Sequence, residues 1–169
     1  LGMVVEIVVI GSIIVGVIHA RTFNLGEISA WYHQSGPYFS MIIAAIPFFL
    51  ILQVQLGKLP FDIPDADQEI MGGPFMEASG PKFALYKWSY FAKQIILVSL
   101  FLEIFIPWPK LGVVPLDILI NLIKVLVVMV LVGVIDAVCP RIRVDQAIRY
   151  FIGIWVILVF ALAFALIGV

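Results

Sequence analysis

Metal and cluster ligands are scarce in this sequence of 169 residues, which holds one cysteine and two histidines. An iron–sulfur cluster usually takes four thiolates, and a zinc site takes clustered Cys and His side chains. The sequence also contains no Gly-rich phosphate loop, no dinucleotide-binding fingerprint and no Ser, His and Asp set typical of hydrolases. We therefore expect the chain to bind no metal or cofactor of its own, and any electron transfer linked to it to take place on other chains.

Charged residues are scarce as well. They make up 12% of the chain, against roughly 25% in soluble globular proteins, whereas hydrophobic residues make up 63%. Apolar stretches near the length of about 20 residues that a membrane span requires recur along the chain. We predict an all-α fold, a polytopic transmembrane helix bundle that occupies residues 1–169 as a single domain. The five predicted spans cover residues 3–19, 38–57, 85–106, 113–138 and 147–169.

The first apolar stretch begins almost at Leu1, with no positively charged region before it and no small-residue cleavage site after it. A secretory signal peptide has both features. We therefore expect this stretch to remain in the protein, and the chain to be one part of a longer polypeptide.

Lysine and arginine are unevenly divided between the predicted loops and the helix starts that adjoin them. In membrane proteins, the short loops that carry more of these residues face the cytoplasm. Only Arg21 and Lys110 follow the first and third spans, so we place loops 58–84 and 140–146 in the cytoplasm and expect a multi-pass protein of the cell membrane. No basic run points to nucleic acid as a partner. Six basic residues follow the second and fourth spans: Lys58, Lys82, Lys87, Arg141, Arg143 and Arg149.

Loop 58–84 gathers five of the chain's eleven carboxylates, namely Asp62, Asp65, Asp67, Glu69 and Glu77. One interpretation is a well-capped helix at the membrane surface, because acids in the first turn of a helix favour its dipole. In the other, four acids within eight residues repel one another, and apolar side chains between them draw the loop against the bundle. Such a half-buried cluster can take up and release protons. We favour the second interpretation and predict that these carboxylates act in ion coupling.

Ionisable residues also fall within the predicted spans. Each would cost about 2.5–3.5 kcal/mol at a helix centre, so such residues usually line a hydrated path or pair inside the bundle. Glu103 and Lys124 lie deepest, and we predict that both act in ion coupling together with Glu6. The residues concerned are Glu6, Lys93, Glu103, Asp117, Lys124 and Asp136.

Two of these acids have alternative interpretations. Asp117, Asn121 and Lys124 have the spacing of one helix face, but Asp117 follows Pro115 closely and is as consistent with a cap at the outer surface. Asp136 lies near the cytoplasmic end of its span, where it either extends to the interface or pairs with Arg141.

Several motifs follow one another along the chain. Residues 60–69 read Pro-Phe-Asp-Ile-Pro-Asp-Ala-Asp-Gln-Glu, residues 77–80 read Glu-Ala-Ser-Gly, and residues 140–146 read Pro-Arg-Ile-Arg-Val-Asp-Gln. They resemble the loops of the membrane subunit called H, or subunit 1, of respiratory complex I, which has Pro-Phe-Asp-x-Pro-Glu-Ala-Glu-Gln-Glu, Glu-Tyr-Ser-Gly and Pro-Arg-x-Arg-Tyr-Asp-Gln. Thr-Phe-Asn at residues 22–24, Glu6 and Lys124 also match in register. The matches run from end to end and correspond to the second half of that subunit.

The resemblance implies a position beneath a cytoplasmic redox arm, next to its last iron–sulfur cluster. In the family, the acidic loop and intramembrane carboxylates begin a charged path towards antiporter-like subunits. By position, the five loop carboxylates and Glu6 inherit that role here. Loop 140–146 is expected to dock the redox arm through Arg141, Arg143 and Asp145.

Two departures from the family pattern narrow the prediction. Tyr90-Phe91 stands where the family has a Glu-Tyr pair, and Asp136 replaces an arginine before Cys139-Pro140. Loss of the helix carboxylate weakens a quinone-linked role. The variant looks similar to the homologous subunit of energy-converting membrane-bound [NiFe] hydrogenases of the archaeal type, which have no quinone step.

The sequence therefore predicts a non-catalytic coupling subunit of a ferredoxin-dependent, hydrogen-evolving [NiFe]-hydrogenase-type complex that exports protons or sodium ions. The [NiFe] centre and the iron–sulfur clusters are expected in partner subunits. Those partners are a hydrogenase-like large subunit and an iron–sulfur small subunit, with antiporter-like subunits beside it in the bilayer. A sulfur-reducing relative and the corresponding subunit 1 of a quinone-reducing complex I remain alternatives, as do a stand-alone ion transporter and a passive membrane anchor.

Overall fold

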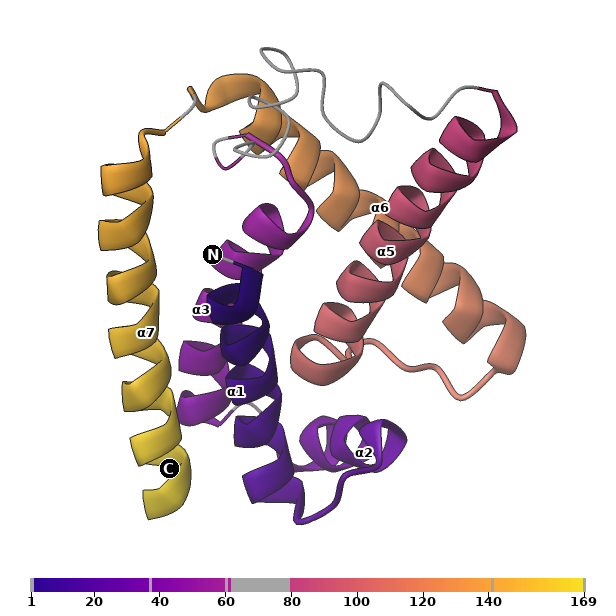
Figure 1. The fold of residues 1–169 in the computed structure, drawn as a ribbon. Coiled ribbons are helices and arrows are strands. Elements are labelled where there is room, and N and C mark those ends of the chain that lie inside the picture. The colour runs from indigo at the N-terminus through magenta and orange to yellow at the C-terminus, as the bar shows by residue number, and fades with distance from the viewer. Residues whose placement is uncertain (1, 37, 60, 62–79, 141, 169) are drawn as a thin grey trace.

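A computed structural model describes residues 2–36, 38–59, 61, 80–140 and 142–168, and all regular structure within these ranges is helical. The prediction of an all-α fold is confirmed for this part of the chain. The helices, labelled in Figure 1, are α1 (Gly2–Ala20), α2 (Leu25–Ser35), α3 (Phe39–Gln55), α5 (Pro81–Phe105), α6 (Val114–Val138) and α7 (Val144–Ile167).

Each of the five predicted spans coincides with one helix, but five membrane crossings are not confirmed. By length and composition, α5, α6 and α7 can each cross a membrane. The pair α1 and α2, bent by 64° at the break between them, adds a fourth if both halves belong to one span. Helix α3 is apolar but has 17 residues, fewer than the about 20 that a perpendicular crossing needs. The crossing by α3 stays a prediction.

Helix α2 is absent from the sequence-based prediction, and a local hydrogen-bond network defines its start. The Asn24 side chain accepts a hydrogen bond from the Gly26 N–H at 3.1 Å, as an N-cap does. The Glu27 carboxylate accepts hydrogen bonds from the Thr22 hydroxyl at 2.7 Å and from the Asn24 amide at 3.2 Å. The Thr-Phe-Asn motif therefore serves to begin α2.

Helices α1, α3 and α7 pack against one another, while α5 packs on α2 and α3 and α6 packs on α5 (Figure 1). Aromatic rings fill the contact between α3 and α5, where the Phe48 ring lies 5.5 Å from those of both Phe101 and Phe105. A second apolar cluster brings together Val8 of α1, Ile51 of α3 and Leu158 of α7. The two clusters together make up the core.

Successive long helices run in alternating directions, which divides the molecule into two ends (Figure 1). At the acidic-loop end lie Lys58 and Leu59 after α3, together with the described residues between α6 and α7, which are 139, 140, 142 and 143. At the α2 end lie α2 itself and the loop of residues 106–113 between α5 and α6. The described residues of the loops that the sequence assigns to opposite sides of the membrane therefore lie at opposite ends of the bundle.

Gly16 lies where α1 approaches three neighbouring helices. A Cβ atom there would lie 3.1 Å from Cγ2 of Ile28 on α2, 3.7 Å from Cε of Met41 on α3 and 3.8 Å from Cγ2 of Ile104 on α5. Glycine thus allows one helix to contact three others, which is how small residues act in membrane bundles.

A leucine at this position is expected to disrupt that packing. Gly16→Leu should lower the free energy of unfolding by about 1–3 kcal/mol or more, because extra methylenes have no space between the helices. The thermal midpoint of the detergent-solubilised assembly measures this effect. Gly153→Leu on α7 is the matched control, since no atom lies within 4 Å of its added Cβ. Equal loss in both variants would contradict the close-packing role of Gly16.

Candidate functional site

Lys124 lies on α6 and binds the end of α5. Its ammonium donates hydrogen bonds to the backbone carbonyls of Ile106 at 3.1 Å and Trp108 at 3.5 Å. Helix α5 ends at Phe105, so these carbonyls lie at its C-terminus, where free carbonyl groups and the helix dipole favour a cation. The lysine predicted from its depth in the span therefore has a defined, half-buried binding position.

Glu103 lies one turn earlier on α5 and is part of the same constellation. Its carboxylate is 3.4 Å from the ammonium of Lys110, which also donates a hydrogen bond to the Ser29 hydroxyl of α2 at 2.8 Å. Glu103, Lys110 and Asp117 are all close enough to act on the charge of Lys124. We call these four residues the charged cluster. It joins α2, α5 and α6 at the α2 end of the molecule.

A cleft of about 100 Å³ opens between α5 and α6 beside this cluster. It has room for several water molecules, since one needs about 10–15 Å³ of such space, and its walls carry polar groups that water can bind. A hydrated cleft next to a carboxylate can accept or deliver a proton. The lining residues are Ser99, Leu102, Glu103, Asn121 and Val125.

Asp117 lies in the first turn of α6 but does not cap the helix, because Val113 is the N-cap residue and no side chain makes a cap hydrogen bond there. Its carboxylate accepts a hydrogen bond from the Leu111 N–H at 2.8 Å, which fixes the α5–α6 loop to the first turn of α6. It also contributes to the charge around Lys124. The Asp117 carboxylate therefore both holds the α5–α6 loop and contributes a negative charge to the charged cluster.

Aromatic side chains surround the α2 end. The His19 ring stacks on Trp31 at 5.4 Å, and its Nε2 lies 2.6 Å from the Ser40 hydroxyl. Tyr32 of α2 packs against Trp108 with ring centroids 4.8 Å apart. Rings of this kind are enriched at membrane–water interfaces, and here they hold α2 and the α5–α6 loop together beside the charged cluster.

Asp136 makes the principal polar contact of α6 at the acidic-loop end. Its carboxylate lies 3.3 Å from the Lys58 ammonium and accepts a hydrogen bond from the Leu59 N–H at 2.7 Å. Lys58 reaches this position because Gly57 has φ 57°, a left-handed conformation that turns the chain as α3 ends. Asp136 thus binds the start of the acidic loop. Arg141, the partner considered from the sequence, lies outside the described residues.

Substitutions at Asp136 separate these two contacts. Asp136→Asn keeps an oxygen acceptor for the Leu59 N–H and loses only the half-exposed ion pair, so we expect a cost of about 0–1 kcal/mol. Asp136→Leu loses both contacts, and a hydrogen bond to a charged group contributes about 1.5–3 kcal/mol. The thermal midpoint of the assembled complex measures the difference. Equal stability of the two variants would show that the Leu59 hydrogen bond contributes nothing.

Among the described residues, the other predicted site residues do not join the charged cluster. Glu6 is exposed on α1, next to Val5, which shares an apolar cluster with Phe61 at the acidic-loop end. Arg143 and Asp145 are exposed at the start of α7, at the same end. Asp62, Asp65, Asp67, Glu69, Glu77 and Arg141 lie outside the described residues.

Sequence reasoning missed Lys110 and Ser29 as site residues. Lys110 was used only to assign the sides of the membrane, and its contact with Ser29 spans 81 residues of sequence, which no local pattern encodes. Helix α2, which carries Ser29, had a usable signal, because an N-cap Asn followed three residues later by Glu marks a helix start. This signal predicts where α2 begins. It does not predict that α2 lies beside the α5–α6 loop, because that position depends on the fold.

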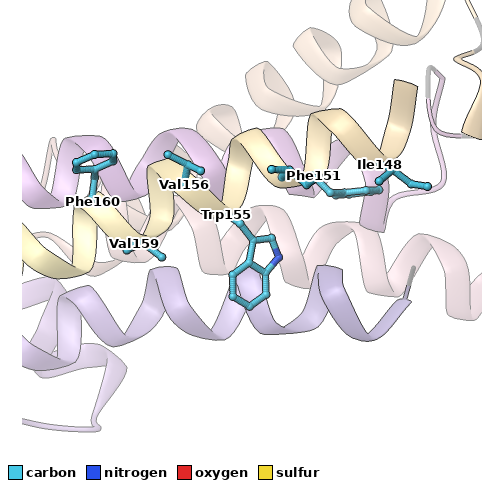
Figure 2. A pocket seen from close by; sticks show the side chains of 7 residues that line it. Ile148, Phe151, Trp155, Val156, Val159 and Phe160 are labelled. Carbon is cyan, nitrogen blue, oxygen red and sulfur yellow. The ribbon is translucent and has the colours of Figure 1, made fainter. Parts of the chain in front are cut away.

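A larger hollow of about 580 Å³ runs along α7 and is shown in Figure 2. Its walls are apolar side chains, so it offers no acid, base or metal ligand and accommodates hydrocarbon. This hollow therefore contributes no chemistry to the candidate site. The lining residues are Ile148, Phe151, Ile152, Trp155, Val156, Val159 and Phe160.

Comparison with known proteins places this geometry in context. The model of a protein family described as NADH dehydrogenase matches residues 1–167. Formate hydrogenlyase subunit 4 of Escherichia coli is 30% identical over 155 residues, which cover 86% of this chain and 50% of that protein. Hydrogenase-4 component C of the same organism is 29% identical over 151 residues, with coverages of 83% and 47%. The membrane subunit called H of the NADH-quinone oxidoreductase of Bacillus cereus is 32% identical over 162 residues, with coverages of 94% and 48%.

The chain therefore spans about half the length of the curated relatives that it matches. Identities of 29–32% are shared by the hydrogenase-type and the quinone-reducing relatives, so identity does not separate the two groups.

Proposed function

The chain belongs to the NADH dehydrogenase family, and from that premise we propose that it couples electron transfer in a ferredoxin-dependent, hydrogen-evolving [NiFe]-hydrogenase-type complex to ion export. It is a multi-pass membrane protein with three candidate spans, or four if α1 and α2 form one. In the proposed topology α1 and α3 cross the membrane as well, giving five spans. The acidic loop and segment 140–146 then face the cytoplasm.

The observation that carries the proposal is the charged cluster with its cleft between α5 and α6. Lysine and glutamate are costly inside a membrane, and they are retained there where they pair or line a water-filled path. Here Glu103 meets both conditions, because it contacts Lys110 at 3.4 Å and lines the cleft. A carboxylate, a second ammonium on Lys124 and space for water are the parts that a proton-transfer step requires.

The proposed partners follow from the family. A hydrogenase-like large subunit and an iron–sulfur small subunit dock at the acidic-loop end, against the loop carboxylates and the segment of Arg143 and Asp145. Antiporter-like subunits lie beside the bundle in the membrane. The [NiFe] centre and the iron–sulfur clusters belong to those partners, and this chain supplies the ion-coupling groups.

Position 90 favours a hydrogenase-type complex over a quinone-reducing one. Tyr90 replaces the carboxylate expected of the quinone-linked subunits, and its hydroxyl packs so closely on Gly57 that a Cβ there would lie 2.5 Å from it. The phenol thus occupies the place where α3 leads into the acidic loop. Two relatives named for hydrogenase and formate hydrogenlyase subunits agree with this choice. The corresponding membrane subunit of a quinone-reducing complex I is the second candidate, favoured by the relative from Bacillus cereus.

The decisive experiment is purification of the native complex through a tag on this chain. We expect a [NiFe]-type large subunit and a small iron–sulfur subunit to co-purify, and the complex to evolve hydrogen from reduced ferredoxin. Inhibitor-sensitive quinone reduction without hydrogen evolution would replace the proposal by its alternative. Ion flux through this subunit reconstituted alone would instead identify a stand-alone transporter.

A further inference from the structure

Lys110 connects three parts of the molecule at the α2 end. It extends from the α5–α6 loop, and its ammonium lies 3.4 Å from the Glu103 carboxylate of α5 and 2.8 Å from the Ser29 hydroxyl of α2. Ser29 is fully buried, whereas Lys110 is exposed. The ammonium therefore sits between a buried hydroxyl and the carboxylate that lines the cleft.

Two other charges of the cluster bind backbone groups. Lys124 binds the carbonyls at the end of α5, and Asp117 binds the Leu111 N–H. Lys110 instead has two partners on different helices. Its ion pair with Glu103 is partly exposed, because 36% of the Lys110 side chain and 38% of the Glu103 side chain are accessible to solvent. Such pairs contribute little net stability, so the ammonium can leave the carboxylate at small cost.

We propose that Lys110 is a positioning residue that controls release of the coupled proton from Glu103 at the α2 end. The inference rests on the proposed coupling function. In the position that the structure shows, the ammonium contacts both the Glu103 carboxylate and the Ser29 hydroxyl and covers the carboxylate. In the other it is held by Ser29 alone, and Glu103 is open to water.

The proton balance of this step is simple. The Glu103 carboxylic acid transfers its proton to a water molecule at the α2 end and becomes a carboxylate. The Lys110 ammonium keeps its three protons and turns towards the new carboxylate, whose charge it compensates, while it remains bound to the Ser29 hydroxyl. No electron moves in this step. Renewed protonation of Glu103 from the cleft side removes that charge and returns the ammonium to Ser29 alone.

The test uses the whole complex in sealed vesicles and measures ions exported per electron pair together with the rate of the redox reaction. We expect Lys110→Gln to lower export per electron pair about fivefold or more, the lower end of coupling between two sites. The redox rate should stay within about twofold, because the redox centres lie elsewhere. Lys110→Arg, which keeps the charge and the donors, should restore at least half of the export.

Two further variants keep the outcomes separate. Ser29→Ala removes the second position of the ammonium, so export should fall although every charge remains. Normal export in either Lys110→Gln or Ser29→Ala would overturn the inference, as would failure of Lys110→Arg to restore export. Glu103→Gln distinguishes a failure of the Lys110 role from a failure of the proposed coupling function. If it lowers export while Lys110→Gln does not, only the role of Lys110 is wrong; if neither does, the proposed coupling function fails as well.

Discussion

Replacing Lys124 by glutamine is expected to abolish most ion export while the complex still assembles and evolves hydrogen. The charge of Lys124 is lost, yet the glutamine amide still donates hydrogen bonds, the role that the ammonium has at Ile106 and Trp108. Export per electron pair should fall at least about tenfold, since positioned proton-transfer groups contribute roughly 10²–10⁴-fold. Ion export into sealed vesicles, measured against hydrogen production, reads out the effect.

Two comparison variants define what the Lys124 result means. Lys124→Met removes the donors as well as the charge, so it should match Lys124→Gln in export but destabilise the α5–α6 loop further. Lys93→Gln is the matched control, because Lys93 is an exposed lysine within α5 and lies outside the charged cluster. Export that survives Lys124→Gln at the level of Lys93→Gln would favour a passive anchor.

Glu103→Gln is expected to have an effect of similar size, because it removes the carboxylate that lines the cleft. Glutamine has nearly the same shape, so the cleft keeps its walls and the loss reports on the charge. Because the charges of Glu103 and Lys124 act on each other, we expect the two substitutions to be non-additive. The double variant Glu103→Gln with Lys124→Gln should therefore export about as little as either single one, since groups that act as a unit do not add.

Additive losses in this double-mutant cycle would contradict the idea that Glu103 and Lys124 serve one step. Normal export in Glu103→Gln alone would remove the carboxylate from the path and leave the cleft without a proton carrier. Assembly in each variant is checked by the amount of partner subunits that co-purify.

The sequence predicts the long helices of this fold well, because bilayer-length apolar runs leave few other structures possible. Helix α2 escaped prediction since it is short and amphipathic, and its start is set by hydrogen bonds among Thr22, Asn24 and Glu27. The number of membrane crossings is less constrained. Helix α3 is apolar but short, so hydropathy alone does not fix its crossing.

The candidate site was predicted in part. Depth within a span identified Glu103 and Lys124, because burying a charge has a cost that composition reveals. The partners of these residues depend on how the loops fold back, and Lys110 and Ser29 come together across two helices. Asp136 illustrates the same limit: its proximity to the cytoplasmic end was predicted, but its contact with Lys58 follows from the turn at Gly57.

Helix α6 is buried only at two positions in its second half. Of its 25 residues only Val128 and Val132 are buried. A tilt of the helix about these two residues would therefore expose little buried area. The midpoint between them lies six residues from Lys124 and six from Asp136, about 9 Å along the axis in each direction. If α6 tilts about this point, a displacement at the Lys58 contact moves Lys124 by about the same distance in the opposite direction. Such a tilt would link the two ends of the bundle without any change in the backbone of α6.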